Sequence, residues 1–459
     1  MASMGQAGRI SLLLGFSIWL CSFSSAAYGA VSNMEWSDWD GRQVCYPSKY
    51  LQPKTEAEIV SVVRKANENG NQIKVVGSGH SFSSITLTSN DRPNAILLNL
   101  DNFNDVIEIS TSAVTVQSGI RIYELNSALL KHGYALENTG AIARQSVAGA
   151  TQTGTHGTGK NLGSMSTQIL QFKLLLANGT VVVANSSQNL DIFYAGRVGL
   201  GSLGIMLETT LKIVPKFKLK RTAMPYSLKQ LLLDLPNLYE KYDRMQWYYT
   251  PFTDNATLLL REEVPIDTPI VPCWPKTLLE IRNLDNNVTC IDWSFKALCH
   301  EADDKIKYTE MEYFVDLDHA DQVVKEFMEY QLGLKDTAGM KCHKESNRCN
   351  LFTGVRYAQK DLNWMSPMYK RDIAVVSNIV LGTSNVTGPP KIFQAFSRFG
   401  LEKIATKYGG RPHWGKQNWA NKTVLRPVYP KFDDFLSLRK QLDPKNMFLN
   451  DYLKRVLGL

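Results

Sequence analysis

Hydrophobic residues in the first half of the chain alternate between helical and strand spacing. Apolar positions between 59 and 66 recur on one helix face, Thr55 and Glu58 form a capping box before them, and Gly70 can end the helix. The apolar run at 73–76 then predicts a strand. This strand leads directly into a loop that is rich in glycine and serine.

The same alternation continues up to Pro215. Asn178-Gly179 suits a tight type I′ turn and therefore predicts a hairpin. The other predicted elements of this half are strands at 95–100 and 114–117, a helix at 123–132, hairpin strands at 170–177 and 180–184, and a strand at 205–214.

Beyond Pro215 the segments become longer and richer in aromatic residues, which predicts a second domain. At 459 residues the chain exceeds one comfortable core, and its 44% hydrophobic and 20% charged residues exclude a disordered protein. The predicted elements here are helices at 228–242, 320–332, 391–408 and 432–442, and strands at 313–315 and 373–381.

The net charge of +8 at pH 7 does not point to a nucleic-acid partner. Lysine and arginine are scattered along the chain, whereas a nucleic-acid binder gathers them in one stripe. The modest basic cluster from Lys212 to Arg221 is interpreted as a solvated face or a link between domains. The expected partner is a small molecule.

The first 30 residues have the layout of a cleaved secretory signal. Arg9 is their only charge, residues 10–23 are almost wholly apolar, and small residues follow. We therefore expect residues 1–27 to be removed and the protein to enter the secretory pathway. The alternative is a retained membrane anchor, but the run is shorter than the roughly 20 residues of a spanning helix.

Cysteines and glycosylation sequons agree with export. Of seven cysteines, Cys21 leaves with the signal, and the others form an even set that can pair in an oxidising compartment. The predicted local bridges are Cys342–Cys349 and Cys290–Cys299, and because no CxxC pair occurs, no metal site is expected. Sequons for N-glycosylation stand at Asn178, Asn185, Asn255, Asn287, Asn385 and Asn421.

Two glycine-rich loops, far apart in the sequence, carry the candidate chemistry. The first begins at Val76-Gly77-Ser78-Gly79 but is not a Rossmann loop, because Phe82 stands where a third glycine is needed. The second, at 154–160, lacks the Ser or Thr that ends a phosphate-binding P-loop, since Asn161 follows it. Two such loops can converge on one long cofactor with a central pyrophosphate. That both are only structural loops stays open.

Five segments together resemble a family of FAD enzymes. They are "GSGHS" after the first strand, "SVAGATQTGTHGTG" at 146–159, "GLGSLGI" at 199–205, "RPHWGK" at 411–416 and "FLNDYLKRVLGL" at the end. In this order, over nearly the whole chain after the signal, they are similar to the vanillyl-alcohol-oxidase type and, within it, to the sugar-1,4-lactone oxidases. The resemblance implies an α+β fold with a two-part PCMH-type FAD-binding domain at 45–216. It also implies an α+β substrate (cap) domain of the aldonolactone oxidase type at 217–459, whose C-terminal segment returns to the flavin.

By the same resemblance, the cofactor is FAD and His80 is its covalent attachment point. The family's histidine is joined to the flavin 8α-methyl group, where a substituent raises the flavin potential. A non-covalent flavin with His80 merely lining the site stays open. The implied cofactor-binding residues are Val76, Gly77, Ser78, Gly79, His80 and Ser81 at the pyrophosphate, Ser146, Gly149, Gly154, His156 and Gly157 along the flavin and ribityl chain, and Gly204 and Ile205 at the far end.

The resemblance also implies catalytic residues. Lys416 corresponds to a cation near flavin N1 and C2=O, where it would stabilise the reduced ring, and His413 belongs to the same motif. Arg356 corresponds to an arginine that polarises the substrate. The family's Glu-x-Arg pair is incomplete, because Gly354 stands in place of the glutamate. Glu312 also matches a family segment but is interpreted as a structural strand residue.

The expected reaction oxidises L-gulono-1,4-lactone with O2, giving H2O2 and a precursor that rearranges to L-ascorbate. Gly140 matches a position where the family's oxidases tend to have glycine, which leaves room for O2. One alternative is an alditol or other aldonolactone oxidase or dehydrogenase, which Gly354 keeps open. Another is a catalytically inactive secreted glycoprotein with a binding role. Association with a membrane surface and the oligomeric state also stay open.

Overall fold

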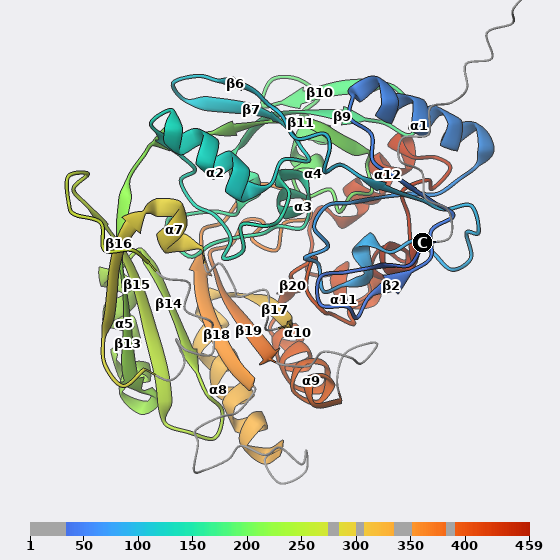
Figure 1. Cartoon of the computed structure of the whole chain (residues 1–459). Helices are drawn as coiled ribbons and strands as arrows, with labels where there is room; N and C mark the ends of the chain where they lie inside the picture. Colours follow the sequence, from blue (N-terminus) through green and yellow to red (C-terminus); the bar gives the residue numbers. More distant parts are fainter. Residues whose placement is uncertain (1–33, 274–283, 300–306, 335–350, 382–390) are drawn as a thin grey trace, which may run out of the picture.

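The computed structural model describes residues 34–273, 284–299, 307–334, 351–381 and 391–459 (Figure 1). The predicted signal at 1–27, the predicted Cys342–Cys349 bridge and the sequon at Asn385 lie outside these ranges. Within them, no helix combines the length and the apolar character that crossing a membrane requires.

A three-stranded parallel sheet forms one part of the first half. Its order is β3 (Lys49–Leu51), β5 (Ile96–Asn99) and β4 (Ile73–Val76), and α1 (Glu56–Asn69) packs against it. Thr55 begins α1 with the predicted capping box, and Gly70 ends it with a left-handed φ of 67°.

A five-stranded antiparallel sheet forms the other part. Its core residues pack against α2 (Ile122–Lys131), α3 (Val147–Gln152) and α4 (Leu190–Gly196). Its first two strands are the hairpin that Asn178-Gly179 predicts. The strand order is β10 (Val181–Asn185), β9 (Ile169–Leu175), β11 (Ile205–Lys212), β7 (Ala113–Gln117) and β6 (Val106–Ile109). Two short ribbons pair β1 (Trp36–Ser37) with β2 (Val44–Cys45) and β8 (Tyr134–Ala135) with β12 (Val214–Pro215).

An eight-stranded antiparallel sheet dominates the second half. It also contains the predicted strands 313–315 and 373–381, the first as part of a longer strand. The strand order is β16 (Val288–Trp293), β13 (Lys218–Ser227), β15 (Asn255–Val264), β14 (Arg244–Tyr249), β18 (Leu351–Ala358), β19 (Ile373–Leu381), β17 (Tyr308–Asp316) and β20 (Arg411–Pro412).

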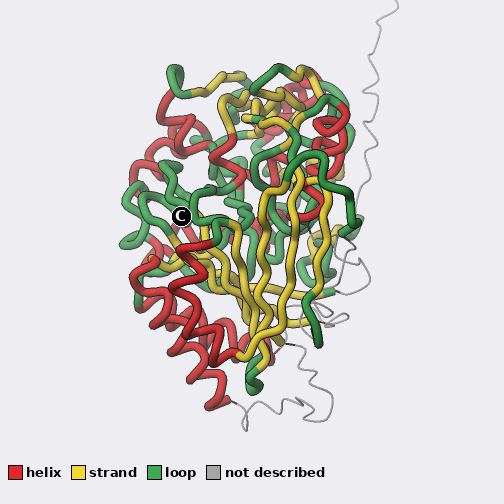
Figure 2. Tube along the Cα trace, turned by 90° about the vertical axis from the view of Figure 1, so that its left-hand side faces the viewer, coloured by secondary structure: helices red, strands yellow, loops and turns green. Residues whose placement is uncertain are grey.

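Helices cover one face of this sheet (Figure 2). They bury large side chains such as Trp247 and Phe327, which leaves the opposite face of the sheet for other contacts. The helix predicted at 391–408 is interrupted by a π-helical turn at Ser397–Leu401. The covering helices are α5 (Leu228–Lys241), α8 (Leu317–Leu334), α9 (Lys391–Phe396) and α10 (Glu402–Lys407).

The C-terminal segment returns to the first half of the chain. The helices α11 (Lys422–Leu425), α12 (Phe432–Leu442) and α13 (Asp451–Leu457) share one hydrophobic core with α2, α3 and α4. The Ile73 amide donates to the carbonyl of Met447 at 3.0 Å. The C-terminal segment therefore supports β4, the strand that precedes the first glycine loop.

The basic cluster from Lys212 to Arg221 is a solvated face only in part, because Lys212 and Lys216 are exposed but other members are buried. Lys218 and Arg221 lie on β13 and are each only 7% exposed. The Lys218 ammonium donates to the carbonyl of Thr268 at 2.6 Å. Lys218 and Arg221 depart from the prediction because β13 lies inside the sheet, between β16 and β15, where long basic side chains find buried acceptors.

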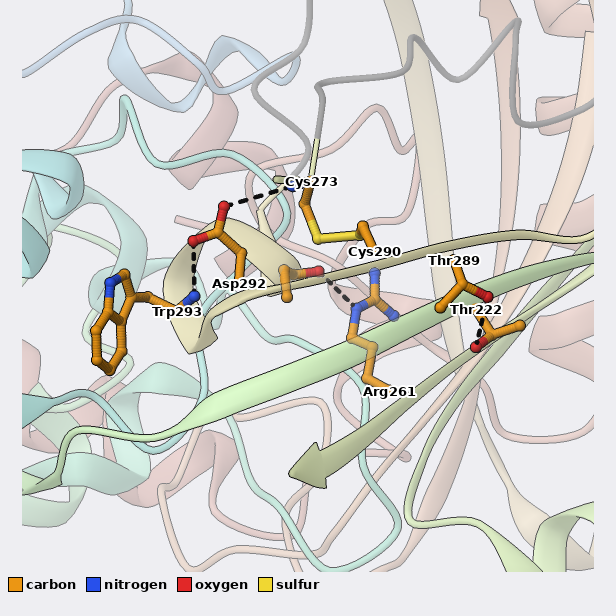
Figure 3. The surroundings of a disulfide bond; sticks show 8 residues. Thr222, Arg261, Cys273, Thr289, Cys290, Asp292 and Trp293 are labelled. Carbon is orange, nitrogen blue, oxygen red and sulfur yellow. Dashed lines mark hydrogen bonds between the residues drawn. A yellow bond between two sulfur atoms is a disulfide. The ribbon is translucent and has the colours of Figure 1, made fainter. Parts of the chain in front are cut away.

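Cys290 forms a disulfide with Cys273, so the predicted Cys290–Cys299 bridge is wrong (Figure 3). Val271 and Ile291 exchange backbone hydrogen bonds of 2.9 and 2.8 Å, which holds the chain before Cys273 beside β16. The two bonded cysteines consequently have Cα atoms 5.0 Å apart. Cys299 follows the short helix α7 (Ser294–Leu298), which carries it away to the first half of the chain.

Candidate active site

The first predicted glycine loop lines one cavity, whereas the second, at 154–160, contributes no residue to the described lining of that cavity. The cavity and the open solvent at its mouth together hold about 890 Å³ of space free of protein atoms. The loop after β4 contributes residues 76–81, Ser146 and Gly149 come from the start of α3, and Gly204 and Ile205 come from the start of β11. Three segments that are far apart in the sequence therefore face the same space.

Backbone and small side chains form much of the wall of this glycine-lined cavity. A Cβ atom on Gly77 would meet Ser146 Oγ at 2.7 Å and Arg121 Nη1 at 3.0 Å. Gly79 and Gly201 have left-handed φ values of 69° and 59°, which glycine adopts without strain. Such a wall lets a ligand come close to backbone N–H groups, so these residues fit a long pyrophosphate cofactor.

Three predicted site glycines lie behind the walls instead. A Cβ on Gly157 would meet Asn138 Oδ1 at 2.4 Å, and one on Gly140 would meet Thr155 Cγ2 at 2.5 Å. Gly154 has a left-handed φ of 77°. None of these three glycines is among the described residues that line this cavity or the neighbouring charged cavity that is described below. Close packing or backbone conformation accounts for each, while a cofactor contact of Gly154 and Gly157 and room for O2 at Gly140 stay predictions.

His80 lines the glycine-lined cavity and also a second one. Its ring stacks on Trp39 with centroids 5.1 Å apart, and the Trp39 amide donates to the carbonyl of Gly79 at 2.8 Å. Desolvation, followed by the charges of Lys416 and Arg121, lowers the pKa of His80 to about 3. The imidazole is therefore neutral near pH 7, and one ring nitrogen keeps a free lone pair.

The second cavity is lined by charged side chains. Together with the open solvent at its mouth, it holds about 820 Å³ of space free of protein atoms. It shares His80, Ser81, Gln145 and Thr153 with the glycine-lined cavity, so the two meet at the end of the first loop. Its charged and imidazole-bearing residues are His80, His156, Glu310, Glu312, Arg356, His413 and Lys416.

Strand geometry explains how the charged cavity is assembled. Glu310 and Glu312 are two residues apart on β17 and therefore project from the same face. The register pairs Arg356 with Val375 on β19, and Val375 with Phe314 on β17. Arg356 consequently projects from that same face, opposite the covering helices.

Glu310 forms an ion pair with Lys416. Its other oxygen, Oε1, is buried and has no hydrogen-bond partner among the described residues. Burial raises the pKa of Glu310 to about 7, although Lys416 acts to lower it. A carboxylate that titrates near neutral pH beside a fixed cation is suited to take up a proton.

Glu312 lies among three nitrogen-bearing side chains. Its oxygens are 3.7 Å from His156 Nε2, 3.9 Å from Arg356 Nη1 and 4.0 Å from His413 Nε2. Burial alone would raise the pKa of Glu312, but Lys416, His156 and Arg356 together hold it well below its usual range. Glu312 is thus a carboxylate that lines the cavity, and its interpretation as a structural strand residue stays untested.

His156, Glu312 and His413 place potential metal-ligating atoms within 4.8 Å of one another. However, His413 Nδ1 accepts a hydrogen bond from the Gly415 amide at 3.0 Å, and burial lowers the pKa of His413 to about 3. The neutral ring therefore carries its proton on Nε2, the nitrogen that faces Glu312. In this form Nε2–H can donate a hydrogen bond to a neighbour, and that nitrogen has no lone pair available for a metal.

His156 lies in the charged cavity, and its predicted contact with the flavin and ribityl chain stays a prediction. It lines the charged cavity and is absent from the described lining of the glycine-lined one. Its Nδ1 lies 2.8 Å from the carbonyl of Gly157, which places the proton on that nitrogen. His156 therefore belongs with the charged residues, together with Arg356, His413 and Lys416, as a wall of the second cavity.

Comparison with known proteins gives two family matches along the chain. Residues 47–185 match the FAD binding domain, and residues 273–456 match D-arabinono-1,4-lactone oxidase. The fold resembles the crystal structure of cholesterol oxidase from Brevibacterium sterolicum, with a TM-score of 0.74 at 16% identity over 93% of this chain and 97% of that one. That likeness concerns the fold alone.

Curated relatives extend over most of the chain. L-gulono-1,4-lactone dehydrogenase of Mycobacterium tuberculosis is 30% identical over 455 residues, covering 92% of this chain and 99% of that protein. L-gulonolactone oxidase of Mus musculus is 29% identical over 441 residues, covering 92% and 98%. D-arabinono-1,4-lactone oxidase of Kluyveromyces lactis is 34% identical over 264 residues, covering 56% and 49%. With a glycine-lined cavity that fits a pyrophosphate cofactor and a charged cavity beside it, the chain belongs to the FAD-dependent aldonolactone oxidoreductases, in the sugar-1,4-lactone oxidase branch.

Proposed function

We propose that this protein oxidises L-gulono-1,4-lactone with O2, giving H2O2 and a precursor that rearranges to L-ascorbate. One observation carries the proposal: the glycine-lined and the charged cavity share His80, Ser81, Gln145 and Thr153. A cofactor held in the first would therefore have one end facing the charged residues of the second. Those residues suit a small ligand with many hydroxyl groups, because they offer both donors and acceptors.

The cofactor is FAD in this proposal, held by residues 76–81, Ser146 and Gly149. When bound, FAD supplies the two-electron acceptor for the carbon that bears the reacting hydroxyl. The neutral imidazole of His80, stacked on Trp39, is the proposed covalent attachment point. An imidazole that stays unprotonated near pH 7 keeps the lone pair that such a bond requires.

The charged residues then act on the substrate. Arg356 and Lys416 donate hydrogen bonds to its oxygens and favour negative charge there. Glu310, with its unpartnered Oε1, accepts the hydroxyl proton as the adjacent C–H bond breaks. His413, neutral with its proton on Nε2, orients the substrate from the same wall.

Purified protein tests this proposal directly. We expect flavin absorbance, consumption of O2 with L-gulono-1,4-lactone, and formation of H2O2 and ascorbate. Turnover of xylitol or sorbitol with inert lactones would show an alditol oxidase, and turnover only with an artificial electron acceptor would show a dehydrogenase. A colourless protein that turns over none of these would contradict the proposal and favour the inactive glycoprotein.

The covalent link has its own experiment. A denaturing gel viewed for flavin fluorescence in acid should show a band for the wild type and none for His80→Ala. His132→Ala is the matched control, because His132 is exposed at the end of α2. A band that persists in His80→Ala, or a wild type that releases all its flavin on denaturation, would contradict the link.

We also propose that the protein enters the secretory pathway. The Cys273–Cys290 disulfide suits an oxidising compartment, and Asn178, Asn287 and Asn421 are exposed and open to glycosylation. Expression in a eukaryotic cell should give a mature protein that starts near residue 28 and loses mass on treatment with an N-glycosidase. An intact N-terminus with no change in mass would contradict this.

A further inference from the structure

Glu312 lies in the same row of the eight-stranded sheet as Gly354, where the Glu-x-Arg pair of the resembled family lacks its glutamate. The register pairs Gly354 with Ser377 on β19, and Ser377 with Glu312 on β17. The three residues are therefore side by side and project from one face of the sheet. The acid that is absent on β18 has a counterpart two strands away.

Position 354 itself has no space for an acidic side chain. A Cβ on Gly354 would lie 2.7 Å from Tyr248 Cε1 and 2.7 Å from Ser377 Oγ, closer than side chains pack. Tyr248 comes from β14, the neighbour of β18 on the other side, and is only 3% exposed. Its ring occupies the place into which a glutamate at 354 would project.

The Glu312 carboxylate has acceptor capacity left for a ligand. Its contacts with His156, Arg356 and His413 are 3.7 to 4.0 Å long, beyond hydrogen-bonding distance. Its side chain is only 2% exposed, and burying a carboxylate without hydrogen bonds is costly. Because Glu312 lines the charged cavity, hydroxyl groups of a bound ligand can supply those bonds.

We propose that Glu312 replaces the absent glutamate as the acidic partner of Arg356 and binds a hydroxyl group of the lactone. Glu312 would then favour lactones that carry a ring hydroxyl group next to its carboxylate. This inference rests on the proposed function, since it assumes a sugar lactone as the ligand. The inference assigns a role in substrate selection to β17, a strand to which the resemblance to the family assigns no such role.

The holoenzyme variants Glu312→Gln and Glu312→Ala test the inference with two substrates, L-gulono-1,4-lactone and a lactone that lacks one ring hydroxyl. A hydrogen bond to a charged group accounts for about 10- to 100-fold in binding. Both variants should raise KM for L-gulono-1,4-lactone by about that factor, with Ala the larger, and change kcat much less. The preference for the hydroxylated lactone should shrink by a similar factor.

Glu262→Gln is the matched control, because Glu262 is an exposed acid on β15 of the same sheet. It should keep wild-type kinetics. Flavin content and the flavin spectrum of the Glu312 variants show that the cavity still folds. Wild-type KM and selectivity in Glu312→Ala would overturn the inference, and so would an equal loss with both lactones, which marks a merely structural role.

Different experimental results would contradict the inference and the proposed function. If the wild type oxidises none of the lactones, the proposed function fails. In that case, the binding of L-gulono-1,4-lactone to Glu312→Gln and to the wild type can still be compared. The measurement is the shift in melting temperature that the lactone causes in each protein. Weaker binding in the variant supports the inference, and equal binding or none in the wild type overturns it.

Discussion

The two cavities that meet at His80 are built in opposite ways. The glycine-lined cavity is formed mainly by loops, where backbone and small side chains face the ligand. The charged cavity is formed mainly by strands, where alternation brings side chains from β17 and β18 to one face. The first suits recognition of a cofactor by backbone groups, and the second suits chemistry by side chains.

Removing the half-buried Lys416 charge from the charged cavity should have the largest effect. Lys416→Met takes away a donor to the substrate and the partner of Glu310, and we expect kcat/KM to fall by about 100- to 1,000-fold. Steady-state kinetics with L-gulono-1,4-lactone measure this. The control is Lys407→Met, which breaks the exposed Lys407–Glu326 pair, a contact that contributes little. Equal activity of the two variants would remove Lys416 from the mechanism.

The dependence of kcat/KM on pH tests whether a side chain of the charged cavity takes part in the chemistry. Because burial raises the pKa of Glu310 to about 7, its carboxylate form gains population as the pH rises through 7. If that form accepts the substrate proton, kcat/KM should rise about tenfold per pH unit below 7 and level off above it. Glu310→Gln should remove this limb and lower the plateau. A variant that keeps the wild-type limb would show that another group titrates.

The sequence predicts the glycine-lined cavity better than the charged one. Residues 76–81 form a contiguous motif, so one segment of sequence reveals one wall. Glu310 and Arg356 are far apart in the chain, and only strand register brings them together. The sequence does contain one signal for the charged cavity: two glutamates at alternate positions of a mainly apolar strand are costly in a core and therefore point to function.

The helices and strands also differ in how far they can be predicted, depending on whether local sequence or distant strand partners determine them. Helix α12 (Phe432–Leu442) matches its predicted range, because its apolar periodicity is local. Strand β13 is not predicted, because buried Lys218 and Arg221 interrupt its apolar pattern and its partners lie far along the chain. The Cys273–Cys290 bridge likewise depends on strand pairing, which spacing between cysteines does not reveal.

The smallest expected effect comes from a glycine substitution in the glycine-lined cavity. Together with a matched substitution outside the cavity, it distinguishes the space that a glycine leaves for the cofactor from the backbone conformation that it adopts. Gly201→Ala and Gly133→Ala both replace a glycine of left-handed φ, 59° and 87°, where a Cβ meets no atom within 4 Å. Each should lower the free energy of unfolding by about 1 to 2 kcal/mol, measured in urea. Only Gly201 lines the cavity, so FAD titrated into flavin-free protein should bind Gly201→Ala several-fold more weakly than Gly133→Ala. Equal FAD affinity would mean that the added methyl group does not meet the cofactor, and that position 201 needs glycine for its backbone conformation alone.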